Sequence, residues 1–293
     1  MELRKIGVVG LGNMGFGMAA SLKRADFEVL GFDISPARRA MVEAQGIRFM
    51  DDQLALLRAV DAVVFSLPYA RDVEAVVTAE GGLLSRNDAS VLVIDTSTSD
   101  PATTRRLAGK LAAAGHGLLD APVSGGPSGA ASGSLTMMIG GAQADIARAQ
   151  PVLAAMSAKA THVGPSGAGN IAKLVNNLLV AAHLVTTGEA MRLAAAAGLA
   201  PEEALKVVNE ATGRSAISEL MYPRWVLPAS FDSGFSAGLM RKDMRLALEL
   251  AAENGIALPL STHVQQLWQE AGWLPDSDDF TRMADYRPRK DMA

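Results

Sequence analysis

The chain has 293 residues, of which 49% are hydrophobic and 20% charged, a composition typical of a globular protein with about two domains of roughly 150 residues each. Its formal net charge is −4, from 27 basic and 31 acidic residues, so it lacks the basic excess that binds a nucleic-acid backbone, and we expect a small molecule as its partner. It has no cysteine, and its four histidines do not fall at ligand spacing, so we expect no disulfide, no thiolate nucleophile and no metal site.

Neither a leader nor a membrane-spanning segment is predicted. Met1 to Lys5 run into a glycine-rich segment, not into an apolar run. No apolar stretch reaches about 18 residues without a polar interruption. We therefore expect no membrane contact and a cytoplasmic protein.

Short β-branched runs alternate with amphipathic stretches in the first half of the chain. This alternation is typical of βαβ units, which build a parallel sheet with helices on both faces. Asp100 is the expected N-cap of one of the helices, with Pro101 at its first position. The predicted strands are Ile6–Val9, Val29–Phe32, Ala62–Leu67, Val91–Ile94, Leu118–Ala121 and Leu135–Ile139. The predicted helices are Phe16–Arg24, Pro36–Gln45, Arg71–Ala79, Pro101–Ala114 and Ala142–Met156.

The pattern changes after Pro165. Ala168–Ala197 contains no proline, only two glycines, and apolar residues three or four positions apart, which predicts one long helix. At 1.5 Å per residue, a helix of about 30 residues spans some 45 Å, longer than one domain needs, so we expect it to pack against a second subunit as well. We therefore predict an α/β domain over residues 1–165 and an all-α domain without strands over residues 166–293.

A glycine-rich turn follows the first predicted strand. It reads Gly10-Leu11-Gly12-Asn13-Met14-Gly15, and Asp33 lies 18 residues beyond it at the end of the second strand. In Rossmann-type domains such glycines allow a tight turn, close approach of a dinucleotide pyrophosphate and close helix packing. A chance cluster of glycines is the alternative, but strand, helix and acidic residue all stand in the required places. The first domain is therefore predicted to be a dinucleotide-binding Rossmann domain.

Asp33 favours NAD over NADP. Its carboxylate can accept hydrogen bonds from the adenosine ribose hydroxyls and would repel a 2′-phosphate. The alternative is that Arg38 and Arg39, which follow closely in sequence, bind the 2′-phosphate of NADP. The simpler interpretation is that these arginines lie on the solvent-exposed face of a helix.

The segment Asp120–Pro127 is a candidate anion site. It ends a predicted strand in a glycine-rich turn. Successive N–H groups of this turn, with the Ser124 hydroxyl, would form a concave nest for a substrate carboxylate. The alternative is an ordinary Gly-Pro loop that binds nothing.

Lys173 and Asn177 are polar residues within the predicted long helix. They lie four residues apart, so both side chains project from one face. Ordinary surface residues are the alternative, but Leu174, Val175 and the apolar run 178–182 indicate a buried setting. Because burial lowers the pKa of a lysine, Lys173 would be suited to exchange a proton with a substrate hydroxyl.

Together these motifs resemble the β-hydroxyacid dehydrogenase family, which includes 3-hydroxyisobutyrate dehydrogenase and tartronate semialdehyde reductase. The resemblance covers nearly the whole chain. It rests on Gly10–Gly15 with Met18 and Ala19, Leu67–Pro68, Asp95–Thr98, Asp120–Gly126 with Gly133–Thr136, Gly167–Asn177 and Met240–Asp243.

The resemblance implies a reaction and a role for each matching residue. NAD would reversibly take hydride from a small 3-hydroxy acid to give its semialdehyde, in a cleft between the two domains of a dimer or tetramer. Lys173 would be the acid/base, and the substrate would be bound by Ser124, Gly125, Gly126, Asn177 and Asp243. The cofactor would contact Gly10, Leu11, Gly12, Asn13, Met14, Gly15, Asp33, Leu67, Pro68, Asp72, Ser97, Thr98 and Lys242.

The chain departs from the family pattern at a few positions near the cofactor. Relatives that use NADP usually carry Asn-Arg-Thr where this chain has Asp33-Ile34-Ser35, which agrees with NAD. Asp72 and Ser21 replace residues that are more common near the cofactor in the family.

Rival functions are disfavoured by two features of the chain. Imine reductases usually lack the helix lysine, and the short helical half disfavours a decarboxylating sugar-acid dehydrogenase. The open alternatives are 2-hydroxy-3-oxopropionate, hydroxysulfonate or serine as substrate, and, more remotely, a non-catalytic dinucleotide-binding scaffold. Six residues are candidate selectivity positions, and no spacing argument ranks them: Arg214, Tyr222, Trp225, Phe235, Met240 and Arg241.

Overall fold

The computed structural model describes residues 3–86 and 89–287. The chain forms two compact units, Met1–Lys173 and Leu174–Ala293. The sequence places the boundary at residue 165, whereas the units divide slightly later, inside the continuous helix α8 (Ala168–Ala196). Each unit has a hydrophobic core of its own.

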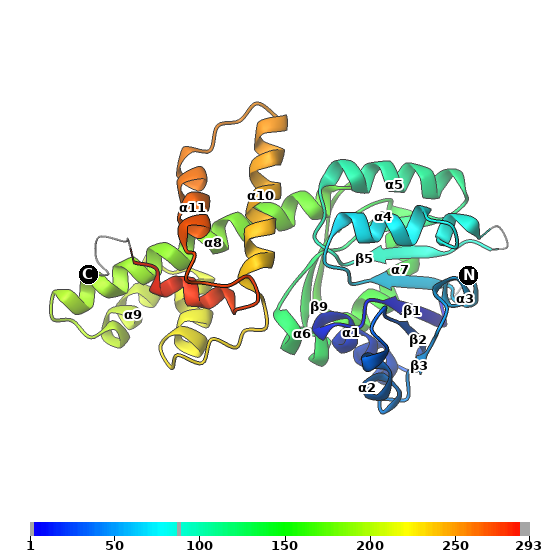
Figure 1. Cartoon of the computed structure of the whole chain (residues 1–293), viewed down its shortest axis with the longest axis horizontal. Helices are drawn as coiled ribbons and strands as arrows, with labels where there is room; N and C mark the ends of the chain where they lie inside the picture. Colours follow the sequence, from blue (N-terminus) through cyan, green and yellow to red (C-terminus); the bar gives the residue numbers. More distant parts are fainter. Residues whose placement is uncertain (1–2, 87–88, 288–293) are drawn as a thin grey trace. The chain divides into compact units, whose positions relative to one another are not determined.

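The first unit is built on one mixed β-sheet (Figure 1). Its strand order is β3-β2-β1-β4-β5-β6-β8-β7, with β9 paired to β8. The strands from β3 to β6 pair in parallel, whereas β8 is antiparallel to β6 and β7 and parallel to β9. The strands are β1 (Lys5–Val9), β2 (Glu28–Phe32), β3 (Arg48–Phe49), β4 (Ala62–Phe65), β5 (Leu92–Asp95), β6 (Gly117–Asp120), β7 (Val123–Ser124), β8 (Leu135–Gly140) and β9 (Ser157–Gly164).

The chain changes direction across the sheet at β1. It builds outward from β1 through β2 to β3, then returns to add β4 on the other side of β1. Ligands of open α/β sheets bind at such a switch point, outside the carboxyl ends of the strands. The loops after β1 and β4 are therefore the expected place for a dinucleotide.

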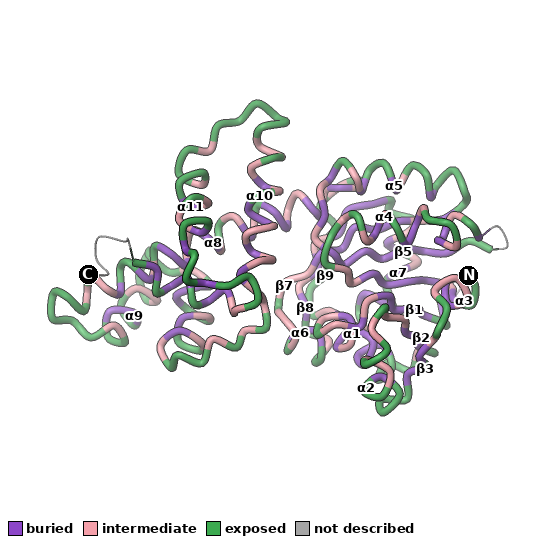
Figure 2. Tube along the Cα trace, in the orientation of Figure 1, coloured by how far each residue is buried: buried purple, intermediate pink, exposed green. Residues whose placement is uncertain are grey.

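Helices cover both faces of the sheet. Val8 belongs to a core with side chains of α1 and α7, and its neighbour Val9 to a core with side chains of α3, α4 and α5. Because neighbouring residues of a strand point to opposite faces, the central strands are buried on both sides, as Figure 2 shows. The helices are α1 (Asn13–Arg24), α2 (Arg39–Glu43), α3 (Gln53–Ala59), α4 (Ala70–Thr78), α5 (Pro101–Ala113), α6 (Gly126–Ser132) and α7 (Gln143–Met156), with 3₁₀ turns η1 (Pro36–Arg38) and η2 (Leu83–Ser85).

The predicted α/β Rossmann-type fold is confirmed, and Asp100 caps α5 by accepting a hydrogen bond from the Thr103 N–H at 2.7 Å. The sequence reading missed β3, β7, β9, α3 and α6. Most of these are short, and β9 is a largely exposed strand whose residues give no alternating apolar signal. The predicted helix Pro36–Gln45 is wrong in detail, because η1 and α2 divide it.

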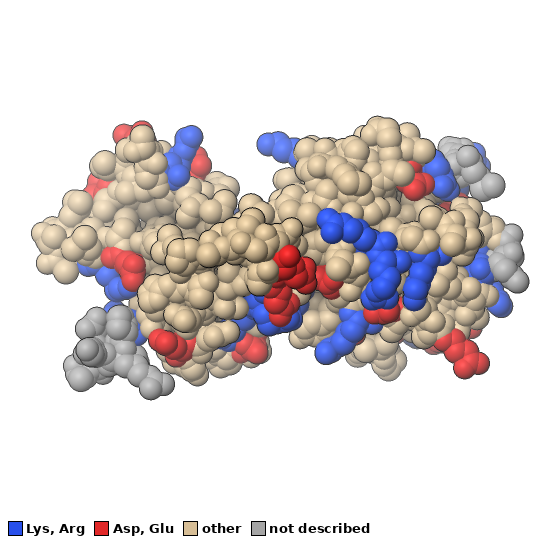
Figure 3. All heavy atoms as spheres, turned by 90° about the horizontal axis from the view of Figure 1, so that it is seen from above, with Lys and Arg blue, Asp and Glu red and all other residues tan. Residues whose placement is uncertain are grey.

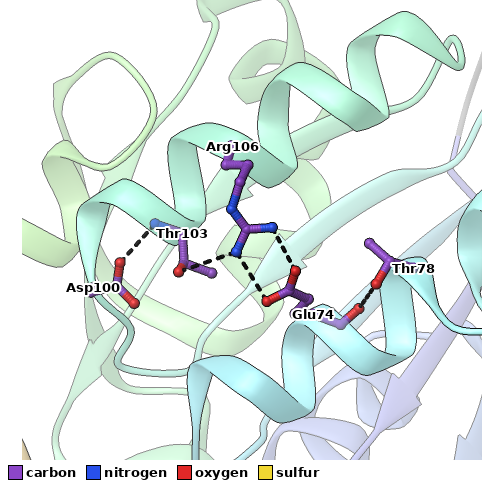
Figure 4. Close-up of polar contacts among 5 residues, drawn as sticks. All are labelled: Glu74, Thr78, Asp100, Thr103 and Arg106. Carbon is purple, nitrogen blue, oxygen red and sulfur yellow. Dashed lines mark hydrogen bonds and ion pairs between the residues drawn. The ribbon is translucent and has the colours of Figure 1, made fainter.

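Helices α4 and α5 are joined at the surface by Glu74 and Arg106. The guanidinium donates to both carboxylate oxygens, at 2.5 and 3.0 Å (Figure 4). These hydrogen bonds lower the pKa of Glu74. Because both side chains are exposed to solvent, the pair adds little stability. It links two neighbouring helices, which follow β4 and β5.

The second unit is helical, as predicted. Its core surrounds Trp268, which is 0% exposed and donates from Nε1 to the Ala181 carbonyl at 3.4 Å. Among residues 174–287 the structure contains no strand, only an isolated bridge between Ser236 and Asp279. Besides α8 it comprises α9 (Pro201–Glu210), the π-helical segment η3 (Ile217–Val226), α10 (Ala237–Glu253), α11 (Pro259–Glu270) and the 3₁₀ segment η4 (Phe280–Asp285).

Of the helices described, α8 alone is long and apolar enough to cross a membrane, by length and composition only. Core helices of other proteins meet the same criterion. Ala181 and Leu184 lie in the core of the second unit, whereas Val175, Leu179 and Leu193 are exposed. The apolar residues of α8 are therefore divided between a core face and an exposed face.

Candidate functional site

The glycine-rich turn after β1 packs closely against the end of β2 and the loop after β4, and its own backbone segments lie close together. Gly10 has a φ of +88°, and its N–H donates to the Phe32 carbonyl at 2.9 Å. A Cβ on Gly10 would collide with the Ser66 carbonyl, and a Cβ on Gly15 would collide with the Gly10 carbonyl. Both positions therefore require glycine, as a tight dinucleotide-binding turn does.

Gly12 has a different environment from its two neighbours in the motif. It is the N-cap of α1, with a φ of −63° and no side-chain cap, and a Cβ there would meet no atom within 4 Å. The first N–H groups of α1, at Asn13 and Met14, have no acceptor within the helix. Open space beside uncapped N–H groups fits a pyrophosphate, so the residues present fit a dinucleotide.

The Asp33 carboxylate stabilises the same turn. Oδ2 accepts a hydrogen bond from the Leu11 N–H at 2.7 Å, and Oδ1 accepts one from the Ser35 N–H at 2.8 Å. Each oxygen has a further lone pair, so the carboxylate can still accept hydrogen bonds from ribose hydroxyls. Asp33 thus lies where the sequence predicted it, beside the glycine turn.

Arg39 is engaged in contacts of its own. Its guanidinium pairs with Asp51 and Glu43 and lies 4.6 Å from the centre of the Phe49 ring. These two carboxylates already pair with the guanidinium that would otherwise bind a 2′-phosphate. The structure therefore gives Arg39 a local role, and the neighbouring Arg38 is half-buried in η1.

The loops after β4 and β5 are joined to each other and approach the glycine turn. The Leu67 N–H donates to Ser97 Oγ at 3.0 Å, and a Cβ on Gly10 would lie 3.0 Å from Leu67 Cδ2. Pro68 and Thr98 follow Leu67 and Ser97 in these loops. The structure therefore brings together the predicted cofactor-binding residues that follow β1, β4 and β5. Asp72 lies in the first turn of α4.

The segment Asp120–Pro127 is more regular than the predicted loop. Val123–Ser124 forms β7 against β8, and α6 begins at Gly126. Gly125 and Gly126 have φ values of +126° and +63°, in the region that favours glycine. The expectation that Ser124 and these glycines hold a carboxylate stays a prediction.

Ser21, one of the departures from the family pattern, lies between α1 and α6. It is 2% exposed, and its hydroxyl donates to the Ala130 carbonyl at 2.8 Å. Arg24 donates to the Ala131 carbonyl at 2.5 Å, and a Cβ on Gly17 would lie 2.8 Å from the Ala131 nitrogen. These contacts fix α6 directly against the first helix of the Rossmann domain.

Lys173 is buried, with 8% of its surface exposed, and is the last residue of the first unit. Leu174 is buried as expected, but Val175 and Leu179 are each 53% exposed, so the expectation that these apolar neighbours are buried is wrong. Residues one or two positions apart on a helix point in different directions. The burial of Lys173 is therefore a property of its own face of α8.

Asn177, one turn after Lys173, belongs to a buried polar cluster in the second unit. Its Nδ2 donates to Asp243 Oδ2 at 2.6 Å, and its Oδ1 accepts from Asn176 Nδ2 at 3.0 Å. Lys242 Nζ lies 3.3 Å from Asp243 Oδ1. The structure thus brings together the predicted site residues of α8 and α10.

Asp120 is a candidate residue to which the sequence reasoning gave no role of its own. It is 0% exposed and accepts hydrogen bonds from the N–H groups of Gly167, at 2.8 Å, and Asn170, at 3.0 Å. Burial raises its pKa, while these N–H donors act in the opposite direction. An acid at the end of an otherwise apolar strand is the signal that points to it.

Arg241, one of the candidate selectivity positions, makes several contacts within the second unit. Its guanidinium donates to the carbonyls of Trp268, Ala271 and Leu274 at 2.9, 3.2 and 3.0 Å. It also pairs with Asp276. Arg241 therefore holds the end of α11 and the segment after it.

The surface of the first unit carries a concentration of positive charge. Figure 3 shows a band of basic side chains across the first unit, in the view from above. Helix α5, the uppermost helix of the first unit in Figure 1, has exposed Arg105, Arg106 and Lys110. Among residues 3–86 and 89–287, no group of three or more His, Asp or Glu side chains is placed to hold a metal.

Two family models match the two parts of the chain. Residues 5–164 match the NAD binding domain of 6-phosphogluconate dehydrogenase. Residues 167–286 match a model described as the NAD-binding domain of NADP-dependent 3-hydroxyisobutyrate dehydrogenase. The chain belongs to the β-hydroxyacid dehydrogenase family. The predicted resemblance is therefore confirmed.

Relatives in the β-hydroxyacid dehydrogenase family match nearly end to end. The 2-(hydroxymethyl)glutarate dehydrogenase of Eubacterium barkeri is 37% identical over 90% of this chain and 88% of its own. The 3-hydroxyisobutyrate dehydrogenase of Pseudomonas aeruginosa is 37% identical over 90% of both chains. A structure of Mycobacterium tuberculosis 3-hydroxyisobutyrate dehydrogenase with L-serine has a TM-score of 0.88 at 32% identity, covering 97% of this chain and 98% of its own.

Family membership establishes an NAD-dependent dehydrogenase, as predicted. The Rossmann domain of this β-hydroxyacid dehydrogenase carries the glycine turn, Asp33, and the joined loops at Leu67 and Ser97. The individual roles of these residues stay predictions, which the following substitution tests.

We predict that Gly12→Ala weakens NAD binding without destabilising the protein. The added methyl group meets no protein atom within 4 Å, so the fold is unaffected, but it occupies the space beside the first turn of α1. The Kd for NAD should rise at least about tenfold, equivalent to about 1.4 kcal/mol. Titration with NADH fluorescence and a thermal melt measure the two quantities.

Gly109→Ala is the matched control for this substitution. Gly109 lies within α5, and a Cβ there also meets no atom within 4 Å. It should stabilise the protein by about 0.5–1 kcal/mol, because alanine is the better helix former, and leave the Kd for NAD unchanged. An unchanged Kd in Gly12→Ala would contradict the assignment of the pyrophosphate to this turn.

Proposed function

We propose that this enzyme reversibly oxidises a small 3-hydroxy acid to its semialdehyde with NAD. The observation that carries the proposal is Lys173, a buried lysine near the start of α8 on the unit that holds the dinucleotide motif. A positioned lysine can exchange a proton with a substrate hydroxyl. The alternative is a non-catalytic scaffold. Burying a charged group costs free energy, and a scaffold without catalysis gives no reason to bury a lysine.

Lys173 Nζ takes the proton of the substrate hydroxyl during oxidation and returns it during reduction. When bound, NAD supplies the acceptor for the hydride that leaves the same carbon. The first turn of α1, beginning at Gly12, would hold the pyrophosphate, and Asp33 the adenosine ribose. Leu67, Pro68, Ser97 and Thr98 would border the nicotinamide.

The acid group of the substrate is held by Ser124, Gly125 and Gly126 in this proposal, and Asn177 orients the substrate. Asp243 fixes the amide of Asn177 through their 2.6 Å hydrogen bond, which supports an orienting role. Lys242, next to Asp243, would reach the cofactor. One substrate must therefore satisfy separate anchors for its acid group, its hydroxyl proton and its hydride.

The 3-hydroxy acid we favour is 3-hydroxyisobutyrate. The names of the relatives from P. aeruginosa and M. tuberculosis support this class of substrate, and the L-serine in the latter structure keeps serine as an alternative. Reduction of 2-hydroxy-3-oxopropionate to glycerate and oxidation of a hydroxysulfonate are the remaining alternatives. All share a hydroxyl on the carbon β to the acid group.

We also propose that the enzyme is a homodimer or homotetramer that uses the exposed face of α8. Val175, Leu179, Thr186, Ala190 and Leu193 are exposed at spacings of three, four and seven residues, which places them in one stripe along the helix. A second copy of the chain would cover this largely apolar stripe. The expected cytoplasmic location likewise stays a proposal.

We predict a higher kcat/KM with NAD than with NADP. Asp33 repels a 2′-phosphate, and the charge of Arg39 is already satisfied by Asp51 and Glu43. Initial rates with each cofactor at matched concentrations measure the preference. An equal or higher kcat/KM with NADP would show that Arg38 provides a phosphate site.

We predict that Lys173→Ala lowers kcat by about 10²- to 10⁴-fold, the range for loss of a general acid/base, with an unchanged Kd for NAD. Steady-state kinetics and NADH titration measure the two effects. Lys110→Ala is the matched control, because Lys110 lies exposed on α5 and should not affect kcat. If Lys173→Ala keeps more than about a tenth of the kcat, the proton is transferred by another group.

We predict that lactate is a very poor substrate compared with every active 3-hydroxy acid. With its carboxylate bound, a 2-hydroxy acid is one carbon too short to present its hydroxyl to Lys173, and a misplacement of about 1 Å can cost 10²-fold. The panel is lactate, 3-hydroxypropionate, 3-hydroxyisobutyrate, glycerate, serine and a hydroxypropanesulfonate, compared by kcat/KM with NAD. Lactate equal to the best 3-hydroxy acid would overturn the geometry, whereas a preferred sulfonate would change only the acid group.

A further inference from the structure

A buried carboxylate joins the carboxyl end of β6 to the start of α8. Asp120 is the last residue of β6 and is 0% exposed. Its Oδ1 accepts a hydrogen bond from the Gly167 N–H at 2.8 Å, and its Oδ2 accepts one from the Asn170 N–H at 3.0 Å. Both donors lie at the beginning of the helix that carries Lys173, and all four residues belong to the first unit.

Glycines allow this close approach between the carboxylate and the helix. A Cβ on Gly169 would lie 2.9 Å from Asp120 Oδ2, and it would also collide with the Met138 carbonyl. A Cβ on Gly140 would lie 2.5 Å from Asp120 Oδ1. Any side chain at either position would displace the carboxylate or the helix, so the packing leaves the start of α8 a single position.

Asn170 holds the same turn from another direction. It is 0% exposed, and its Nδ2 donates to Thr104 Oγ1 on α5 at 3.0 Å. Its Oδ1 accepts from the Ser99 N–H, in the segment before α5, also at 3.0 Å. The turn cannot slide or rotate without breaking buried hydrogen bonds, and unsatisfied buried groups are costly.

We propose that Asp120 is a positioning residue for Lys173, acting through the first turn of α8; this rests on the acid/base role of Lys173 proposed above. Lys173 lies three residues after Asn170, about 4.5 Å further along the axis at 1.5 Å per residue. A shift of the turn therefore moves the amine with it. A misplacement of about 1 Å can already reduce catalysis 10²-fold.

A helix cap does not require the complete burial that Asp120 has. Asp100 caps α5 as a partly exposed residue, without the cost of complete burial. Asp120 is completely buried, so its ionised form has lost its hydration, and burial raises its pKa. Stability alone does not explain this buried carboxylate. A requirement to hold the first turn of α8 in one position does explain it.

A double-mutant cycle tests the proposal. Asp120→Asn keeps the shape of the side chain but replaces one acceptor oxygen by an NH₂ donor, so one N–H of the turn loses its partner. On its own it should lower kcat about 10- to 100-fold and leave the Kd for NAD unchanged. In the Lys173→Ala background it should have no further effect on kcat, because no amine remains to be positioned.

Several outcomes would overturn the proposal. An equal loss of kcat from Asp120→Asn in both backgrounds would mean a general structural role, and an unchanged kcat in the single variant would mean that the turn does not need the carboxylate. If Lys173→Ala itself keeps its kcat, the proposed function fails instead. If Lys173→Ala loses activity and Asp120→Asn does not, only the positioning role of Asp120 fails.

Thr104→Val decides the question if Asp120→Asn does not fold. It removes the acceptor of Asn170 Nδ2 from the same turn while Asp120 stays in place. Its effect should be a smaller loss of kcat that again disappears in the Lys173→Ala background. A loss of the same size in both backgrounds, or no loss in the single variant, would overturn the proposal.

Asp95→Asn is the matched control. Asp95 is 2% exposed, lies opposite Asp120 on β5, and accepts a hydrogen bond from the Ser97 N–H at 3.0 Å. Because Ser97 belongs to the proposed nicotinamide loops, this variant should raise the KM for NAD, whereas Asp120→Asn should lower kcat. The same pattern in both variants would indicate a common loss of structure and would contradict the proposal.

Discussion

The carboxyl ends of parallel strands meet at one edge of a sheet, and the candidate site of this protein depends on that constraint. The glycine turn follows β1, Asp33 follows β2, Leu67 follows β4, Ser97 follows β5, and Asp120 ends β6. Strand pairing brings these residues from distant parts of the sequence to the same edge. Asp33 then accepts a hydrogen bond from the glycine turn, and Ser97 accepts one from Leu67 in the neighbouring loop.

Close approach of backbone to backbone is the second requirement, and glycine provides it where a turn or a helix start would otherwise collide with a side chain. Gly10 and Gly15 allow the dinucleotide turn to close, while Gly169 allows α8 to start against Asp120. Gly12 differs, because the space beside it is empty of protein atoms. This difference separates glycines needed for folding from Gly12, to which we assign the space for the cofactor.

Much of the fold and part of the site could be predicted from the sequence. Parallel strands buried on both faces are apolar runs, and the glycine motif with Asp33 is short and local, so both leave a clear pattern. The exposed strand β9 and the short helix α6 leave no such pattern and were missed. Burial of Val175 and Leu179 was predicted wrongly, because apolar composition does not reveal which face of a long helix meets a core.

The sequence by itself determined the family, the Rossmann domain, the NAD cofactor and the helical second half, because these depend on local motifs and on hydrophobic periodicity. Tertiary structure decided what the isolated polar residues do. Arg241, a candidate selectivity position, donates hydrogen bonds to backbone carbonyls, and Ser21 joins two helices. Asp120 gained a role only once its partners Gly167 and Asn170, distant in sequence, were in contact with it. A hydrogen bond between distant residues leaves no periodic signal, so only the folded chain reveals it.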